Sequence, residues 1–361
     1  MTRTPAARID GTALILCEGS YATGFGKTAH GLVRFTRRYR VRGVIDSTLA
    51  GRDAGTALDG RPRGIPIVAG LDEGLALPGD AVTHLVVGVA TPGGRLPGPL
   101  RPAIHDALNR GLHVDSGLHT FLSEDAEFAD IARRVGARIR DVRKPPPRSE
   151  LHFPTGRIEE VRCPRIAVLG TDCAVGKRTT AWLLVQALEG MGCAAEMVGT
   201  GQTAWMQGVR HGLVLDSIVN DFVTGEIEHA VLGAWRERAP RVIVIEGQGS
   251  LIHPACPGGF EILGGARPTA VVIQHAPGRQ WLEGFDGTAP AHPKRHMEIL
   301  RLMGDIPTLA VTLSRENLSP KELDAAIESI GAETGVPVID PFADDAVGLA
   351  LLVRQGLEKT G

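Results

Sequence analysis

The residues best suited to chemistry lie in one glycine-rich segment. An apolar run at residues 165–169 leads into it, and an apolar helical pattern at residues 179–188 follows it. A strand, a glycine loop, a lysine, a hydroxyl and a helix, in this order, are the parts of a phosphate-binding P-loop, whose N–H groups and lysine attract phosphate oxygens. The residues that we predict to hold phosphates are Gly170, Thr171, Cys173, Ala174, Val175, Gly176, Lys177, Arg178 and Thr179.

This loop departs from the usual pattern G-x-x-x-x-G-K-[ST] in two ways. Its leading glycine, Gly170, comes one place early, which resembles the GTDxxxGK loop of the dethiobiotin synthetase group. Arg178 replaces the hydroxyl that would bind Mg²⁺, and a guanidinium pairs with phosphate oxygens but cannot ligate a cation. We therefore predict diphosphate binding without a metal ion. Thr179 or Thr180 could still supply a hydroxyl if the helix register were shifted, and a plain glycine turn is the structural alternative.

A second group of polar residues follows the apolar run at residues 241–245. Glu246 comes directly after this run, and Gln248 lies two residues further on. Open α/β sheets bind their ligands at the carboxyl ends of their strands. Glu246 is therefore our first candidate for a general base, with helix capping as the alternative. Asp172 is a further candidate catalytic carboxylate, and Gln248 is a candidate substrate contact.

Another strand, predicted at residues 269–273, is followed by His275 and Arg279. A histidine can transfer protons near neutral pH, and an arginine can hold a carboxylate with two hydrogen bonds. Structural roles for both residues are an equal alternative. Asp221 could contact a substrate ammonium group or stabilise the start of a helix.

The elements that position these residues alternate between strands and helices on both sides of Pro145-Pro146-Pro147. Three consecutive prolines favour an extended spacer. Apolar runs at residues 13–17, 41–45, 84–89 and 112–114 predict strands before it, and runs at 195–198, 308–313 and 336–339 predict further strands after it. The sequence thus predicts an α/β protein with two domains, at residues 1–143 and 165–361, joined by a linker at residues 144–164.

The first domain contains a weaker glycine motif, which runs from Gly24 to Ala29 and matches G-x-G-x-x-A. Asp46 follows the next predicted strand at a spacing suited to a ribose contact. Six residues separate the motif from its own strand, whereas a dinucleotide fingerprint turns directly off the strand. This spacing disfavours nicotinamide binding.

The composition narrows the choice of partners and location. The formal charge of -2 offers no overall attraction to nucleic acid or to an anionic membrane, so we predict neither as a partner. The five cysteines form no CxxC pair, and no apolar run has the length of a signal peptide or a membrane span. We expect a cytoplasmic protein without a metal site, and the base rate for such enzymes favours a homo-oligomer, most often a dimer.

Motifs along the whole chain resemble those of the D-glutamate N-acetyltransferase family. The segments that carry this resemblance are Glu18-Gly19, Gly26-Lys27-Thr28-Ala29, Gly93-Gly94-Arg95-Leu96-Pro97, Ser116-Gly117-Leu118-His119, Asp141-Val142-Arg143, the P-loop, Asn220-Asp221-Phe222, Glu246-Gly247-Gln248-Gly249-Ser250 and Gln274-His275-Ala276-Pro277-Gly278-Arg279. The resemblance implies a Rossmann-like parallel sheet followed by a three-layer α/β/α P-loop domain.

The same resemblance implies acetyl transfer from acetyl-CoA to the amino group of D-glutamate or a similar small amino acid. The P-loop would hold the CoA phosphates, Glu246 or His275 would accept the ammonium proton, and Arg279 would bind a carboxylate. The main alternative is Mg-ATP chemistry, in a kinase or a carboxylate-amine ligase, with Thr179 and either Asp172 or Glu246 as metal ligands. A non-catalytic nucleotide sensor is a third possibility.

Overall fold

The structure, a computed structural model, describes residues 9–360, and the side chains of residues 9–356. Residues 1–8, where the sequence predicts no signal peptide, lie outside the described part. The chain forms two compact units. The first comprises the chain up to Pro146 together with residues 202–209, and the second comprises residues 147–201 and 210–361. None of the described helices is both long and apolar enough to cross a membrane.

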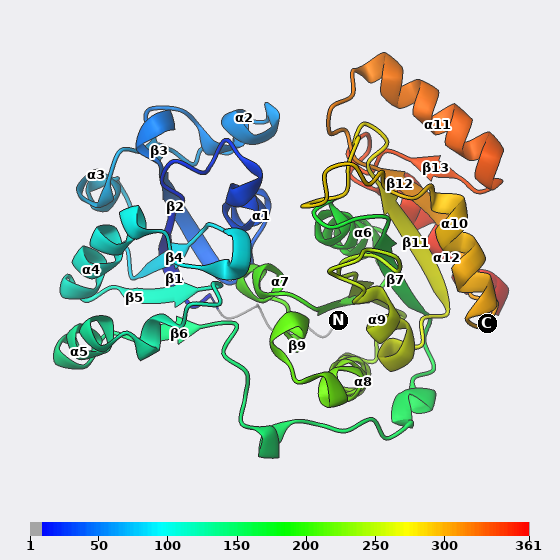
Figure 1. The fold of residues 1–361 in the computed structure, drawn as a ribbon, viewed down its shortest axis with the longest axis horizontal. Helices are drawn as coiled ribbons and strands as arrows, with labels where there is room; N and C mark the ends of the chain where they lie inside the picture. The colour runs from blue at the N-terminus through cyan, green and yellow to red at the C-terminus, as the bar shows by residue number, and fades with distance from the viewer. Residues whose placement is uncertain (1–8, 361) are drawn as a thin grey trace. The chain divides into compact units, whose positions relative to one another are not determined.

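The first unit is built on a six-stranded parallel sheet with the strand order β3-β2-β1-β4-β5-β6 (Figure 1). This is the strand order of the Rossmann fold. The strands are β1 (Gly11–Leu16), β2 (Tyr39–Ile45), β3 (Ile67–Val68), β4 (His84–Val87), β5 (His113–Ser116) and β6 (Ile139–Asp141). The helices are α1 (Lys27–Arg34), α2 (Ala54–Asp59), α3 (Leu71–Ala76), α4 (Arg101–Asn109) and α5 (Ala126–Val135). The apolar residues of β1 and β4 are fully buried, as expected of strands that are continuous apolar runs in the sequence.

A short helix from the later part of the chain, α7 (Gln202–Gln207), also belongs to this unit. Met206 is fully buried in the apolar core of the first unit. The Gln207 side-chain amide donates hydrogen bonds to the carbonyls of Gly31 and Phe35, and the guanidinium of Arg38 lies 3.8 Å from the Trp205 ring centre. The structure therefore differs from the unbroken second domain, residues 165–361, that the sequence suggested, because α7 buries its apolar side chains in the first core.

The second unit contains a seven-stranded parallel sheet with the order β13-β12-β11-β7-β10-β8-β9. Its strands are β7 (Arg165–Gly170), β8 (Ala195–Gly199), β9 (His211–Gly212), β10 (Val242–Glu246), β11 (Ala270–His275), β12 (Thr308–Leu313) and β13 (Val338–Ile339). Its helices are α6 (Lys177–Gly190), α8 (Asn220–Arg238), α9 (Gly259–Ala266), α10 (Pro293–Leu302), α11 (Pro320–Thr334) and α12 (Val347–Thr360). The helices α6 and α12 pack together, as do α8 and α9, and Figure 1 shows helices on both faces of the sheet.

The strand order brings the predicted site residues of the second unit to one edge of this sheet. Strand β7, which leads into the P-loop, pairs with β10 on one side and with β11 on the other. Glu246 therefore lies opposite Val168, and Gln274 lies opposite Gly170. Because all three strands are parallel, their carboxyl ends meet at the same edge, where ligands bind in this class of fold.

Candidate functional site

Lys177 is the first residue of α6, and its side chain folds back into the P-loop. Its Nζ donates a hydrogen bond of 2.6 Å to the carbonyl of Asp172. The stem passes so close to Gly170 and Gly247 that a Cβ at either position would lie 2.9 to 3.0 Å from its Cδ. Burial lowers the pKa of Lys177 to about 8. The loop thus holds a cation away from water, and a phosphate oxygen would be a stronger partner than the carbonyl it now contacts.

The N-terminus of α6 adds to the attraction for anions. The first N–H groups of a helix have no acceptor within the helix. In the described part of the chain, no side chain caps this end of α6. These N–H groups and the helix dipole therefore favour an anion beside Lys177.

Asp172 and Arg279 form a buried ion pair that holds the loop in place. Arg279 Nη1 donates to Asp172 Oδ2 at 2.7 Å and to the Cys173 carbonyl at 2.8 Å, and its Nη2 donates to Glu316 Oε2 at 2.7 Å. Asp172 also accepts hydrogen bonds from the amides of Cys173 and Glu283. Both side chains, which the sequence suggested for chemistry and for binding a carboxylate, therefore have partners within the protein. Those two roles stay predictions, and the contacts themselves make the pair a clamp on the P-loop.

Replacing Arg279 with alanine is expected to destabilise the second unit by about 3–5 kcal/mol, because the Asp172 carboxylate would be left buried without its partner. A urea titration followed by tryptophan fluorescence measures this change. As a control, Arg301→Ala removes an exposed arginine from α10 and should change the stability by less than about 0.5 kcal/mol. An equal effect of the two substitutions would contradict the clamp.

Glu246 lies at the end of β10 and is almost fully buried. Its Oε2 accepts a hydrogen bond of 2.8 Å from the Thr200 amide. Burial raises the pKa of Glu246, although the positive charges of Arg178 and Lys177 oppose this effect. A carboxylate with a raised pKa beside an anion-binding loop suits proton transfer near neutral pH.

His275 and Gln274 end the neighbouring strand β11. The His275 Nδ1 is hydrogen-bonded to Thr171 Oγ1 at 2.8 Å, and burial together with His292 and His296 lowers the pKa of His275 to about 4. This histidine is therefore neutral at pH 7 and a weaker base than Glu246. Gln274 Oε1 accepts hydrogen bonds from the hydroxyls of Thr180 and Thr312. The Thr180 hydroxyl thus already has a hydrogen-bond partner within the protein. Of the two threonines that the sequence offered as metal ligands, Thr179 is therefore the better candidate.

The two remaining predicted contacts lie in different surroundings. Gln248 is half-buried, and its amide lies so close to Gly201 that a Cβ there would be 2.8 Å from Nε2. Asp221 is exposed in the first turn of α8. An acidic side chain there stabilises the helix through its dipole, which is the structural alternative named above. Substrate binding by either residue stays a prediction.

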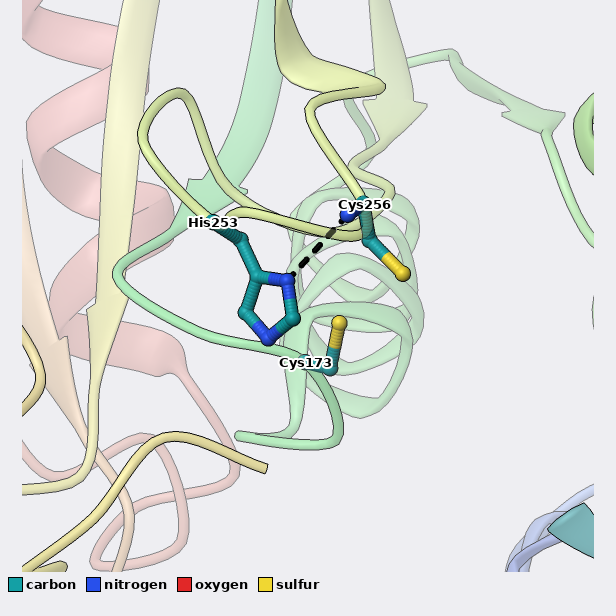
Figure 2. Close-up of side chains that lie close together, drawn as sticks. All are labelled: Cys173, His253 and Cys256. Carbon is teal, nitrogen blue, oxygen red and sulfur yellow. Dashed lines mark hydrogen bonds between the residues drawn. The ribbon is translucent and has the colours of Figure 1, made fainter. Parts of the chain in front are cut away.

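The sequence interpretation missed a cluster of Cys173, His253 and Cys256, whose possible metal-ligand atoms all lie within 4.8 Å of one another (Figure 2). Cys173 belongs to the P-loop, and the other two residues belong to the loop between β10 and α9. Both loops follow the carboxyl ends of neighbouring strands. The cluster could have been predicted from this adjacency only if the order of the strands in the sheet had been known.

The glycine motif of the first unit is not arranged for a ribose. The Asp46 side chain is fully buried and accepts hydrogen bonds from the Tyr21 amide and from the amide and hydroxyl of Thr48. These contacts fix the turn after β1 to the end of β2. The carboxylate that a ribose contact would need is thus engaged by the protein.

A P-loop between β7 and α6, together with a separate sheet in Rossmann order, defines this chain as a two-domain α/β P-loop protein. The chain belongs to the DUF1611 family. Residues 152–350 match the family's P-loop domain of unknown function, and residues 47–145 match its Rossmann-like N-terminal domain.

The chain is also similar to two named proteins and to one protein of solved structure. A D-glutamate N-acetyltransferase of Tritonibacter scottomollicae is 28% identical over 272 residues, which cover 73% of this chain and 78% of that protein. A D-glutamate N-acetyltransferase of a Pseudoalteromonas species is 29% identical, covering 72% and 77%. The crystal structure of a DUF1611 family protein from Anabaena variabilis has a TM-score of 0.86 and 28% identity, covering 95% of this chain and 99% of that one.

Proposed function

We propose that the protein transfers the acetyl group of acetyl-CoA to the amino group of D-glutamate or a similar amino acid. The observation that carries this proposal is the composition of the P-loop. Lys177 and Arg178 offer two positive charges to a diphosphate, Arg178 stands where a hydroxyl ligand of Mg²⁺ is usual, and the Thr180 hydroxyl is bonded to Gln274. Such a loop suits a phosphate group that is held but not cleaved. The names of the two relatives support the same reaction.

In this proposal the loop from Gly170 to Thr179 binds the CoA phosphates and fixes the thioester relative to the end of β10. Glu246 accepts a proton from the substrate ammonium, because its raised pKa makes it a stronger base than an exposed glutamate. The free amine attacks the thioester carbonyl, the new C–N bond forms, and the C–S bond breaks as CoA leaves as a thiol. The amides of Gly247 to Gly249 are the proposed donors to the oxyanion.

Arg279 retains a proposed part in binding the substrate carboxylate. Its Nη1 is held by the buried Asp172, whereas its Nη2 is bonded to Glu316, whose side chain is 38% exposed. A substrate carboxylate could replace Glu316 at Nη2 without disturbing the bond to Asp172. The arrangement then gives Arg279 one structural contact and one exchangeable contact.

The test uses the purified protein with D-glutamate and acetyl-CoA in the presence of EDTA, and follows the release of free thiol. We expect thiol release that depends on the protein and on the amino acid, with L-glutamate as the stereochemical control. Failure to release thiol with any amino acid, together with Mg-dependent formation of ADP or phosphate from ATP, would reject acetyl transfer and favour the kinase or ligase alternative.

The affinity for acetyl-CoA is expected to fall as the pH rises above about 8. Only the protonated Lys177 attracts phosphate, and burial lowers the pKa of this group to about 8 in the unliganded protein. Above that pH, binding must take up a proton, so the dissociation constant should increase towards about tenfold per pH unit. Calorimetric titrations with acetyl-CoA, which carries no free thiol, measure this dependence. Lys177→Met should bind weakly with no such dependence, and a flat profile for the wild type would contradict the assignment.

A further inference from the structure

Two thiols meet beside the phosphate loop. Cys173 lies between β7 and α6, and Cys256 lies between β10 and α9. Figure 2 shows the two sulfurs facing one another, and the possible metal-ligand atoms of Cys173, His253 and Cys256 all lie within 4.8 Å of one another. Cys256 is exposed, whereas Cys173 is half-buried. A small reagent can therefore reach one sulfur, with the second directly behind it.

The main chain around each sulfur is held by several hydrogen bonds. The Cys173 amide donates to Asp172 Oδ1 at 2.6 Å, and its carbonyl accepts from Arg279 at 2.8 Å. The Cys256 amide donates to His253 Nδ1 at 3.1 Å, and its carbonyl accepts from the Ser250 amide at 3.0 Å. The two thiols are thus brought together by the fold itself.

Gly249 allows the second of these loops to close tightly. Its φ of 53° lies in the left-handed region, and a Cβ at this position would collide with the Cys256 carbonyl. Only a glycine fits such a position without strain. The approach of Cys256 to the P-loop therefore depends on the backbone of the Glu246-Gly247-Gln248-Gly249-Ser250 segment.

The surroundings of His253 favour a reaction between the thiols over a metal site. Its Nδ1 already accepts hydrogen bonds from the amides of Ala255 and Cys256. Its Nε2 lies 3.3 Å from the Glu283 carbonyl and 3.4 Å from Asp172 Oδ1, which requires a proton on Nε2. Neither nitrogen has a lone pair free for a metal, so two thiols remain as ligands, fewer than zinc sites use.

We propose that Cys173 and Cys256 form a reversible disulfide when the protein meets a peroxide, and that this bond weakens phosphate binding by the loop. The exposed Cys256 sulfur attacks the peroxide oxygen, which gives a sulfenic acid and releases an alcohol or water. The Cys173 sulfur then attacks the sulfenic sulfur and displaces water. In sum, two thiols lose two hydrogens and two electrons, and one peroxide is reduced.

The charges at the site support this order of steps. The hydrogen bond with Cys256 and burial both raise the pKa of the Cys173 thiol. Cys173 therefore stays protonated, and the exposed Cys256 is the sulfur that a peroxide reaches first. The thiolate is the reactive form towards a peroxide.

The disulfide would change the phosphate loop because the two sulfurs must approach to about 2.05 Å. Cys173 lies four residues before Lys177, and the ammonium of Lys177 is close enough to act on the Cys173 thiol electrostatically. Moving Cys173 towards Cys256 shifts the adjoining amides and the Asp172 carbonyl that Lys177 contacts. We expect CoA to bind at least about tenfold more weakly, the equivalent of losing one hydrogen bond to a charged group.

The experiment treats the full-length protein with hydrogen peroxide, removes the peroxide, and measures free thiols, linked peptides and the binding of acetyl-CoA, which has no free thiol to reduce the disulfide. Two of the five thiols per chain should disappear, tryptic digestion should yield a peptide that links Cys173 to Cys256, and a dithiol reductant should restore both the thiols and the affinity. The thiol count and the linked peptide need neither turnover nor a bound ligand, so they test the disulfide independently of the proposed acetyl transfer, whereas the binding measurement rests on the proposed function.

Two variants make the test specific. Cys256→Ser leaves the P-loop sequence intact, and peroxide should no longer weaken its CoA binding. Cys193→Ser removes a buried cysteine elsewhere and should respond like the wild type. The proposal is overturned if no linked peptide forms, or if peroxide weakens CoA binding equally in Cys256→Ser. It is also overturned if the untreated protein binds one Zn²⁺ per chain through these thiols and His253.

Discussion

Glu246→Gln is expected to lower kcat for acetyl transfer by about 100- to 10,000-fold, the usual contribution of a general base. The amide keeps the size of the side chain and an acceptor for the Thr200 amide, but it cannot take a proton. The affinity for CoA should change little, because the P-loop is intact. Thiol release under saturating substrates measures kcat, and calorimetry measures the affinity.

The pH profile distinguishes this role from a structural one. In the wild type, kcat/KM should fall on the acid side with an apparent pKa above the ordinary glutamate value of about 4.3, because burial raises the pKa of Glu246. In Glu246→Gln the pKa of Glu246 should no longer appear in the profile. The remaining rate should instead follow the fraction of substrate amine that is deprotonated in solution, and should rise about tenfold per pH unit below the pKa of that amine. Glu298→Gln, an exposed change on α10, is the control. A rate close to that of the wild type would exclude Glu246 as the base.

Lys177→Ala is expected to weaken CoA binding by roughly 30-fold or more, because truncating one partner of a buried charge pair costs about 2–5 kcal/mol. The lysine is buried, its stem passes beside Gly170 and Gly247, and its Nζ donates a hydrogen bond to the Asp172 carbonyl. Equilibrium binding of CoA to the purified variant measures the loss.

The chain provides a matched control for this change. Lys27 also follows a glycine directly, but it is exposed at the start of α1 in the first unit. Lys27→Ala should leave CoA binding unchanged, whereas equal losses in the two variants would show that the phosphates are not held by the loop after β7. Circular dichroism of both variants establishes that they fold.

The fold could be predicted from the sequence wherever a strand is buried on both faces. Such strands are continuous apolar runs, and those of β1, β4, β7 and β10 were recognisable for this reason. The two-residue strands β3 and β9 were not predicted, since they are too short for a periodic pattern, whereas β13 lies within the run predicted at residues 336–339. The sequence of α7 does not indicate that this helix belongs to the first unit, because its membership depends on which of the two cores buries Met206.

A general rule predicts which residues come together in the site, but it does not predict which of them form hydrogen bonds with one another. Residues that follow parallel strands meet at one edge of the sheet, so the sequence alone predicts that Lys177, Glu246 and His275 lie together. The bonds of Arg279 to Asp172 and Glu316 join three loops, and loop conformation is not encoded in a short pattern. The lowered pKa of His275 could not be predicted either. It is caused by burial and by the nearby His292 and His296, which are distant from His275 in the sequence.

The placement of residues 202–209 in the first unit affects how this protein can be divided. The chain passes between the two units after Pro146, after Gly201 and after Val209. A fragment cut at the proline segment would lack Met206 in its core, and the complementary fragment would expose the apolar side chains of α7 to water. Neither unit therefore corresponds to one continuous segment of the sequence. An exchange of P-loop units between relatives would also have to exchange a piece of the partner's core, which ties the evolution of the two units together.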